Sequence, residues 1–297
     1  MDGWQWTTTF NFAYNHNEVL SINGEEDKII SSSNPITKSL FVGESVNNIY
    51  SYNWDGIVSD KMMTVPENEA ATNNGFKPGD DVRSCDYYHK VYGWNEGMPI
   101  IEDVNGDGVI DDNDKYVLGS QDPKWTGSVT STLTWKGWDL SFTLYTKQDY
   151  TIYSPFLADN YDYNYRGWNN IAMDYYIPAG TLIGCDGVNA DGTYINPVYQ
   201  EETHYGTYPM PRGVGNYYGM GDIYYNKGVS NLAGIKKNVW YWKFKNITLG
   251  YNFPKKLLDP WKCQSLRLYV NITNPFCWSN YEGFDPEWAG VSMEKDA

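Results

Sequence analysis

The sequence predicts an all-β protein, namely a portion of an antiparallel transmembrane β-barrel with long extracellular loops. Three observations support this prediction. Segments of about ten residues alternate between apolar and polar side chains, which is the length and pattern of a tilted membrane-spanning strand. Trp and Tyr residues gather near the ends of the apolar faces. Finally, tight turns alternate with very long polar stretches, as they do in outer-membrane barrels.

The alternation has a period of two in five segments. In residues 3–15, for example, Trp4, Phe10 and Tyr14 share one face, and the opposite face carries Gln, Thr and Asn. A soluble β-sandwich also alternates, but it would favour Val, Ile and Leu on its buried faces. A sixth segment, 46–58, is rich in Tyr and Ile but less regular. The five regular segments are 3–15, 125–135, 137–147, 241–253 and 265–273.

The lengths of the connections provide independent support for a membrane barrel. A tight turn at Lys136 joins two strands, whereas the stretches 59–124 and 149–239 are long and polar. Compact soluble domains rarely contain loops beyond about 12–15 residues without secondary structure. Barrels of the outer membrane have short periplasmic turns and long extracellular loops, so we expect both stretches outside the cell. We expect the segment 17–45 on the periplasmic side, although it is longer than a typical turn there.

Composition and charge exclude several classes of protein. Aromatic residues make up 17% of the chain, with 27 Tyr and 13 Trp, and rings with a polar tip suit water boundaries. No apolar stretch approaches the roughly 20 residues of a membrane helix, which excludes helical membrane proteins only. The formal charge is −15 with no basic stripe, so nucleic acid is excluded as a partner. The four cysteines form no CxxC motif, and Cys85 with Cys185 is the one disulfide pairing that we considered.

Residues 103–114 follow the spacing of an EF-hand calcium loop, with Gly108 at position six, where the chain turns sharply. Four carboxylates so close together would repel one another without a cation. The alternative is an Asp/Asn/Gly turn that binds no metal. Because no pair of amphipathic helices flanks the loop, we expect a structural calcium that stiffens the stretch 59–124. The expected ligands are Asp103, Asn105, Asp107, Val109 through its carbonyl, Asp111, and Asp114 in place of the usual Glu.

Several runs of residues resemble SusC/RagA-type TonB-dependent transporters. The calcium loop and the residues that follow it, up to Ser141, resemble the family's run DVNGDGxID…G…P…G…L…YKGFDLS. Residues 242–258 resemble the run RLKNITLGYNLPK. These motifs occur in the family's order over residues 43–287. The further matching stretches are 43–57, 266–276 and 281–287.

The resemblance implies that residues 1–297 are the C-terminal part of a 22-stranded barrel with an internal plug, of which about six strands are present. It also implies location in the outer membrane of a Gram-negative bacterium, in contact with lipid, and import of oligosaccharides or peptides energised through TonB. A SusD-like lipoprotein would close over the extracellular loops. The chain has no signal peptide, plug or TonB box, so we expect it to be truncated at both ends and to lack the N-terminal region that contacts TonB.

The long stretch 149–239 contains a cluster of aromatic residues that we expect to stack on sugars or to contact the lipoprotein lid. In the alternative interpretation, these rings pack the loop against itself. The six residues of this cluster are Tyr161, Tyr163, Tyr165, Trp168, Tyr175 and Tyr176.

Two other functional classes remain open from the residues alone. A secreted, calcium-stabilised, β-rich carbohydrate-binding module would use the calcium loop and the exposed aromatics in the same way. A glycoside hydrolase needs two carboxylates about 5–9 Å apart, and no local pattern pairs the acids of this chain. The three histidines, His16, His89 and His204, have no Ser or Cys nucleophile context. We therefore predict no catalytic residue, and no enzyme.

Overall fold

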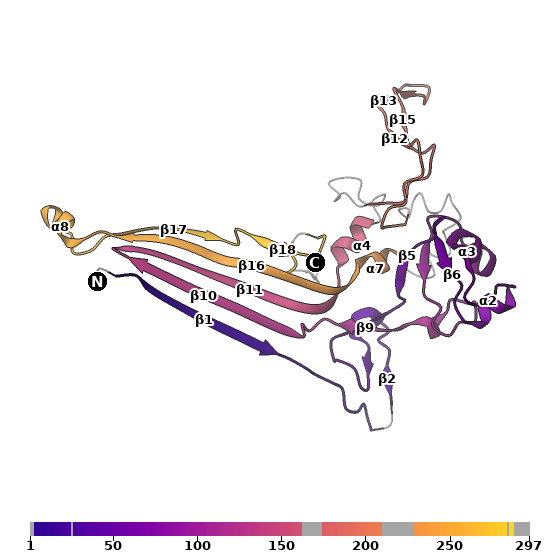
Figure 1. The fold of residues 1–297 in the computed structure, drawn as a ribbon, viewed down its shortest axis with the longest axis horizontal. Coiled ribbons are helices and arrows are strands. Elements are labelled where there is room, and N and C mark those ends of the chain that lie inside the picture. The colour runs from indigo at the N-terminus through magenta and orange to yellow at the C-terminus, as the bar shows by residue number, and fades with distance from the viewer. Residues whose placement is uncertain (1–2, 25, 162–173, 210–228, 284, 288–297) are drawn as a thin grey trace. The chain divides into compact units, whose positions relative to one another are not determined.

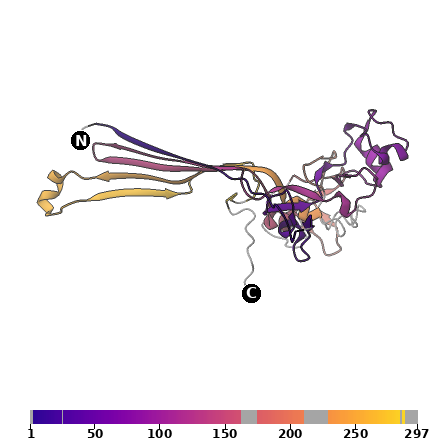
Figure 2. The same cartoon turned by 90° about the horizontal axis from the view of Figure 1, so that it is seen from below.

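A computed structural model describes residues 3–24, 26–161, 174–209, 229–283 and 285–287, without the side chains of residues 159–161 and 229–231. The chain divides into two compact units. Unit 1 comprises residues 1–49, 119–152 and 236–297, and unit 2 comprises residues 50–118 and 153–235. Each unit is described by itself below, and the ribbons are drawn in Figures 1 and 2.

Unit 1 is built on a six-stranded antiparallel sheet with the order β1-β10-β11-β16-β17, in which β18 also pairs with β16 (Figure 1). Each of the five regular segments expected from alternation forms one of its strands. Both long connections leave from the same end of the sheet, after β1 and after β11, and short connections lie at the other end. The strands are β1 (Gln5–Tyr14), β10 (Trp125–Trp135), β11 (Trp138–Tyr153), β16 (Ile235–Asn252), β17 (Arg267–Thr273) and β18 (Cys277–Ser279).

The register places like side chains opposite one another. Val129 of β10 faces Phe10 on one side and Leu144 on the other. The next residue, Thr130, likewise pairs with Thr143. Because alternate residues of a strand point to opposite faces, the sheet has one apolar face and one polar face. This confirms the predicted fold class, an antiparallel barrel portion.

Two strands change phase along their length. In β11, Asp149 adopts a φ of 57°, and the regular alternation ends there. In β16, the Phe244 ring contacts Phe142 of the apolar face at 5.6 Å, whereas the Lys245 ammonium lies 5.3 Å from the Tyr145 ring on the polar face. Phe244, an even-numbered residue, thus lies on the apolar face. From Ile247 to Phe253, in contrast, the odd-numbered residues are the apolar ones. A local irregularity keeps each kind of side chain on its own face.

The expectation that 46–58 is a strand of the wall is wrong. This segment forms two short strands, β4 (Asn48–Ser51) and β5 (Trp54–Ile57), and neither belongs to the six-stranded sheet. All four residues of β4 are buried, so its side chains do not alternate between two environments. As a consequence, the segment 17–45 belongs to the connection that leaves after β1, at the same end of the sheet as the second long stretch, and not at the opposite end as expected.

Unit 1 also contains short elements outside the main sheet. Strand β2 (Lys28–Ile29) pairs with β3 (Leu40–Phe41), and α1 (Pro35–Lys38) lies between them in sequence. Helix α8 (Lys255–Leu258) and the 3₁₀ helix η3 (Asp259–Trp261) connect β16 to β17.

Unit 2 consists of short helices and two-stranded sheets. The pairs are β5 with β8, β6 with β7, β12 with β15 and β13 with β14, and β4 pairs with β9. Buried aromatics form much of its core, including Tyr52, Trp94 and Tyr208. The remaining elements are β6 (Met62–Thr64), α2 (Glu69–Asn73), β7 (Asp81–Arg83), α3 (Ser84–Tyr92), β8 (Pro99–Ile101), η1 (Asp112–Asp114), β9 (Tyr116–Ser120), α4 (Pro155–Tyr161), β12 (Leu182–Gly184), β13 (Gly187–Val188), β14 (Tyr194–Ile195), β15 (Val198–Tyr199) and α7 (Val229–Gly234).

Two properties concern the chain as a whole. Among the described residues, no helix is both long enough and apolar enough to cross a membrane. All four cysteines are free, including Cys85 and Cys185, so the disulfide that we considered is not formed in the structure.

Candidate functional site

The polar face of the main sheet carries hydroxyl, amide and charged side chains. The hydroxyls of Thr130 and Thr143 lie 3.2 Å apart across β10 and β11. Arg267 of β17 donates to Asp139 of β11 at 2.6 Å, and Asn252 of β16 donates to the same carboxylate at 3.2 Å. A face of this composition is suited to contact with water and polar solutes.

The apolar face is exposed in unit 1. Trp6, Phe10 and Phe12 of β1 are 73%, 75% and 71% exposed, although each is a large hydrophobic side chain. On β17, Leu268 and Val270 are 60% and 65% exposed. Exposed apolar surface of this extent marks a region that contacts a membrane or another protein surface.

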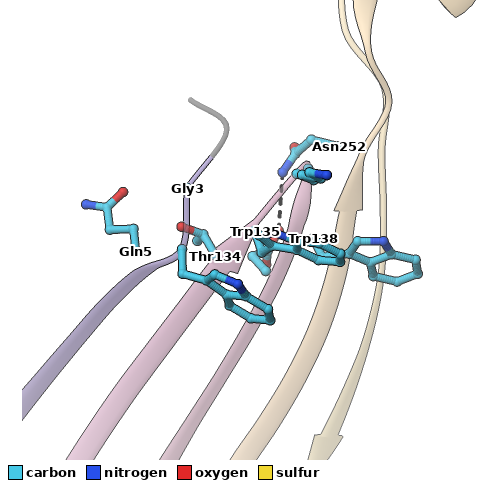
Figure 3. Close-up of a pocket in the computed structure, with 10 residues that line it drawn as sticks. Gly3, Gln5, Thr134, Trp135, Trp138 and Asn252 are labelled. Carbon is cyan, nitrogen blue, oxygen red and sulfur yellow. Dashed lines mark hydrogen bonds between the residues drawn. The ribbon is translucent and has the colours of Figure 1, made fainter.

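Aromatic side chains gather at the end of the sheet where the tight turn lies. The rings of Trp4 and Trp135 stack at 4.9 Å with an interplanar angle of 8°, and Trp138 contacts Tyr251 at 4.7 Å. Trp4, Trp135 and Trp138 border a shallow cavity of about 430 Å³ that Asp139 also lines. Figure 3 shows Trp135 and Trp138 at this cavity. Indole rings at strand ends match the aromatic girdle at a membrane–water boundary.

The proposed calcium loop lies in unit 2 between β8 and β9, and its last three residues form η1. Gly108 has a φ of 88°, which confirms the sharp turn expected at position six. The loop packs closely on α2: the Ala70 amide donates to the carbonyl of Gly106 at 2.9 Å. A Cβ at Gly106 would lie only 2.8 Å from the Cβ of Asn68, so glycine is required there.

The carboxylates of this loop accept hydrogen bonds from its own backbone. Asp114 is fully buried, and its two oxygens accept from the amides of Val104 and Asp111 at 2.9 and 2.7 Å. Asp103 accepts from the amides of Gly106 and Gly108 at 2.7 and 2.8 Å. These contacts fix the loop conformation and leave acceptor capacity on the carboxylates, since each oxygen has two lone pairs.

Two tyrosines connect this loop to the rest of unit 2. The Tyr92 hydroxyl donates to Asp103 at 2.8 Å, and burial together with this bond raises the pKa of Tyr92. Burial, with the carboxylates of Asp112 and Asp114, raises the pKa of Tyr52 to about 12. Both phenols therefore stay neutral at physiological pH, and Tyr92 acts as a hydrogen-bond donor to the loop.

The loop 103–114 offers oxygen ligands from several of its residues. The six predicted ligands all lie within one turn-rich loop, and they offer the hard oxygens that calcium prefers. In the described part of the chain, however, no group of three or more His, Cys, Asp or Glu side chains is gathered closely enough to hold a metal ion. Residue types and backbone turns fit calcium, while the side chains are oriented toward backbone amides.

The predicted aromatic cluster is only partly described. Tyr175 contacts Tyr208 at 6.3 Å, and Tyr176 is 6% exposed and contacts Tyr205 at 5.6 Å. These two rings pack within unit 2, as the alternative interpretation expects for them. Tyr161 ends α4, but its side chain lies outside the described residues, and so do the three positions Tyr163, Tyr165 and Trp168.

Sequence reasoning missed one group of charged residues. Lys243 of β16 is 2% exposed and pairs with Asp285 and Glu287, which lie 42 and 44 positions later in the sequence. The only local signal is the alternation of Lys243 and Lys245 with Trp242 and Phe244. No rule of local spacing connects these lysines with their partners.

Known proteins of similar sequence match nearly the whole length of this chain, although no family model matches it. The TonB-dependent receptor P39 of Formosa agariphila is 28% identical over 314 residues, which cover 95% of this chain and 25% of that protein. The TonB-dependent receptor SusC of Bacteroides thetaiotaomicron is 24% identical, covering 95% of this chain and 22% of its own length. The chain thus spans about a quarter of the length of these relatives.

Solved structures share the fold. The RagAB peptide transporter matches 97% of this chain and 25% of its own chain, with a TM-score of 0.55 and 15% sequence identity. The RagAB peptide importer in its closed-closed state matches 97% of this chain with a TM-score of 0.51 and 15% identity.

Proposed function

The chain resembles SusC/RagA-type TonB-dependent receptors along 95% of its length, as its motifs predicted, and we propose that it forms part of the wall of an outer-membrane transporter. In this proposal the apolar face of the main sheet contacts lipid and the polar face lines the lumen. The observation that carries the proposal is the exposure of Phe10 and its neighbours on one face. A tilted strand of this kind is stable in lipid only when its apolar side faces the acyl chains.

The same observation argues against the carbohydrate-binding module. A secreted sandwich would bury the apolar face of each sheet against a second sheet. Here Trp6, Phe10 and Phe12 are more than two-thirds exposed. Among the residues that the structure describes, the outer strands β1 and β17 also keep unpaired edges, which a barrel removes by pairing with further strands.

Import of a nutrient is the activity that we propose for the whole transporter. The names of the related proteins support this: SusC is a TonB-dependent receptor, and RagAB is a peptide transporter. We propose oligosaccharides or peptides as substrates, energy coupling through TonB, and a SusD-like lipoprotein as the partner. Four aromatic positions are candidates for contact with the substrate or with this lipoprotein. They are Tyr161, Tyr163, Tyr165 and Trp168.

We propose that calcium has a structural role in unit 2. The support is the donor set of residues 103–114 and the positive φ of 88° at Gly108. Binding would draw the carboxylates from their backbone partners toward one cation and reduce their mutual repulsion. The role is stabilisation of the loop, since β8 and β9 are the adjacent elements rather than two amphipathic helices.

The proposal is tested with the full-length receptor that contains this chain. The protein should appear in the outer-membrane fraction and dissolve only with detergent. Deletion of its gene should abolish growth on one class of oligosaccharide or peptide and leave growth on the monomers unchanged. Recovery of the protein in the soluble secreted fraction would instead support the carbohydrate-binding module.

A further inference from the structure

The ammonium group of Lys243 is almost fully buried within an ion-pair cluster of unit 1. The side chain is 2% exposed, and its Nζ lies 2.5 Å from Oδ2 of Asp285 and 3.0 Å from Oε2 of Glu287. Lys245, two residues along the same strand, pairs with the other oxygen of Glu287. Two lysines therefore meet two carboxylates, and the four charges sum to zero.

This cluster joins β16 to a short segment beyond β18. An ammonium group that is buried without a partner costs several kcal/mol, so removing both carboxylates would be strongly unfavourable. Asp285 and Glu287 retain 32% and 29% exposure of their side chains, and they can be hydrated if Lys243 is lost. Burial of the Lys243 ammonium group therefore requires the two carboxylates, whereas the carboxylates tolerate the loss of the lysine.

A hydrogen bond and ring packing also attach this segment to the sheet. The Tyr150 hydroxyl donates to the carbonyl of Pro286 at 3.3 Å. Within the segment, the Glu287 amide donates to the Asp285 carboxylate at 3.0 Å. The ring of Tyr281 packs against a cluster of buried side chains from β11 and β16. That cluster consists of Tyr150, Ile152, Val239 and Tyr241.

The segment lies on the polar side of the sheet. Lys245 lies over the ring of Tyr145, and Tyr145 in turn contacts Tyr241 at 6.1 Å. Tyr145 shares its face of β11 with Asp139 and Thr143, whose partners are polar. The Glu287 carboxylate reaches the lysines of β16 from that same face.

We propose that residues 281–283 and 285–287 form a fixed strap over the polar face of β11 and β16, held by Lys243, and that the strap covers this part of the barrel lumen. Position 284 lies outside the described residues. The location in a lumen rests on the proposed function, whereas the strap itself rests on the contacts above. Because both lysines are neutralised within the chain, neither Lys243 nor Lys245 presents a free ammonium group to an anionic solute. A tethered carboxylate has a high effective concentration, so a dissolved anion competes poorly for Lys243.

The test is amide hydrogen exchange by mass spectrometry on the full-length receptor in detergent micelles. In the wild type, the peptide covering 281–287 should exchange at least about tenfold more slowly than an unstructured peptide. Lys243→Met removes the charge and keeps the length of the side chain, so it should accelerate exchange in this peptide about tenfold or more. Exchange in residues 246–252 of β16 should stay unchanged. Lys256→Met, at an exposed position in α8, is the matched control and should match the wild type.

Further variants keep the test decisive if Lys243→Met fails to fold. Asp285→Asn with Glu287→Gln should release the strap but leave a buried lysine. Adding Lys243→Met to this pair should restore the stability of the wall while the strap stays released. Rapid exchange of 281–287 in the wild type, or equal protection in the wild type and the triple variant, would overturn the strap. Since the readout is not transport, failure of the proposed import function would leave this result intact.

Discussion

Arg267 and Asp139 form an ion pair that reaches across the intervening strand of the sheet. Arg267 lies in β17 and Asp139 in β11, and β16 lies between these two strands. The Nη2 atom of Arg267 is 2.6 Å from Oδ2 of Asp139. The pair passes directly over Gly250 of β16, where a Cβ would lie 2.7 Å from Asp139 and 2.8 Å from Arg267.

We predict that Gly250→Ala separates this ion pair and destabilises the wall. The added methyl group displaces the ends of these two flexible side chains, and the loss of such a partly exposed ion pair costs about 1 kcal/mol or less. The temperature at which the full-length barrel loses its compact form in heated SDS gels should fall. Gly127→Ala is the control, since its new Cβ would meet Thr146 at an ordinary 3.4 Å. Equal melting of the two variants would refute this role for Gly250.

We predict that calcium protects the loop 103–114 from proteolysis. Calorimetric titration of the full-length receptor should detect binding at millimolar or lower concentrations, the range of extracellular calcium modules. Asp107→Ala should abolish both the binding and the protection. Asp112→Ala is the matched control, because Asp112 lies in the same loop outside the predicted ligand set and its side chain is 88% exposed. A titration without heat, or protection that persists in Asp107→Ala, would leave a metal-free Asp/Asn/Gly turn.

We predict that unit 2 loses stability in alkaline solution between pH 10 and 12. Burial first, and the neighbouring Tyr87 and Asp55 second, raise the pKa of Tyr88 from 10.0 to about 12. Folding thus favours the neutral phenol, so its stabilising effect is complete below pH 10 and is lost as the pH rises above that value. Protease resistance of unit 2 should fall across this range.

The variant Tyr88→Phe should weaken this alkaline dependence, because it removes one of the ionising groups of unit 2 and keeps the ring. Tyr194→Phe, at a position 49% exposed, is the control and should follow the wild-type profile. A dependence that is unaltered by Tyr88→Phe would show that other groups cause the loss.

The strands of the main sheet were largely predictable, because the sheet has one apolar and one polar face and its strands therefore alternate strictly. Residues 125–135 were predicted with the bounds that the structure gives to β10. The strands β11 and β16 extend beyond the predicted segments to Tyr153 and from Ile235. Most of the extra residues lie beyond the positions near Asp149 and Lys245 where the alternation of apolar and polar side chains shifts by one residue. A pattern with a single period of two does not continue past these positions.

The features that the sequence did not predict depend on contacts between residues that are far apart in the sequence. The segment 46–58 resembled a strand through its Tyr and Ile residues, but Asn48, Ile49 and Tyr50 are all buried in a two-stranded pair. The strap depends on pairing between Lys243 and acids more than 40 positions away. Local spacing contains no information about such a contact. The calcium loop, in contrast, is local, and its turn at Gly108 was predicted from spacing alone.

The most direct test of the central claim compares arginine at two adjacent positions on opposite faces of β10. Val129 lies on the apolar face and Thr130 on the polar face, close to the middle of the strand. If the apolar face contacts lipid, Val129→Arg in the full-length receptor should lose about 2–4 kcal/mol of stability in bilayers, and Thr130→Arg should lose little. Equal losses for the two variants, or a greater loss for Thr130→Arg, would contradict the assignment of the two faces.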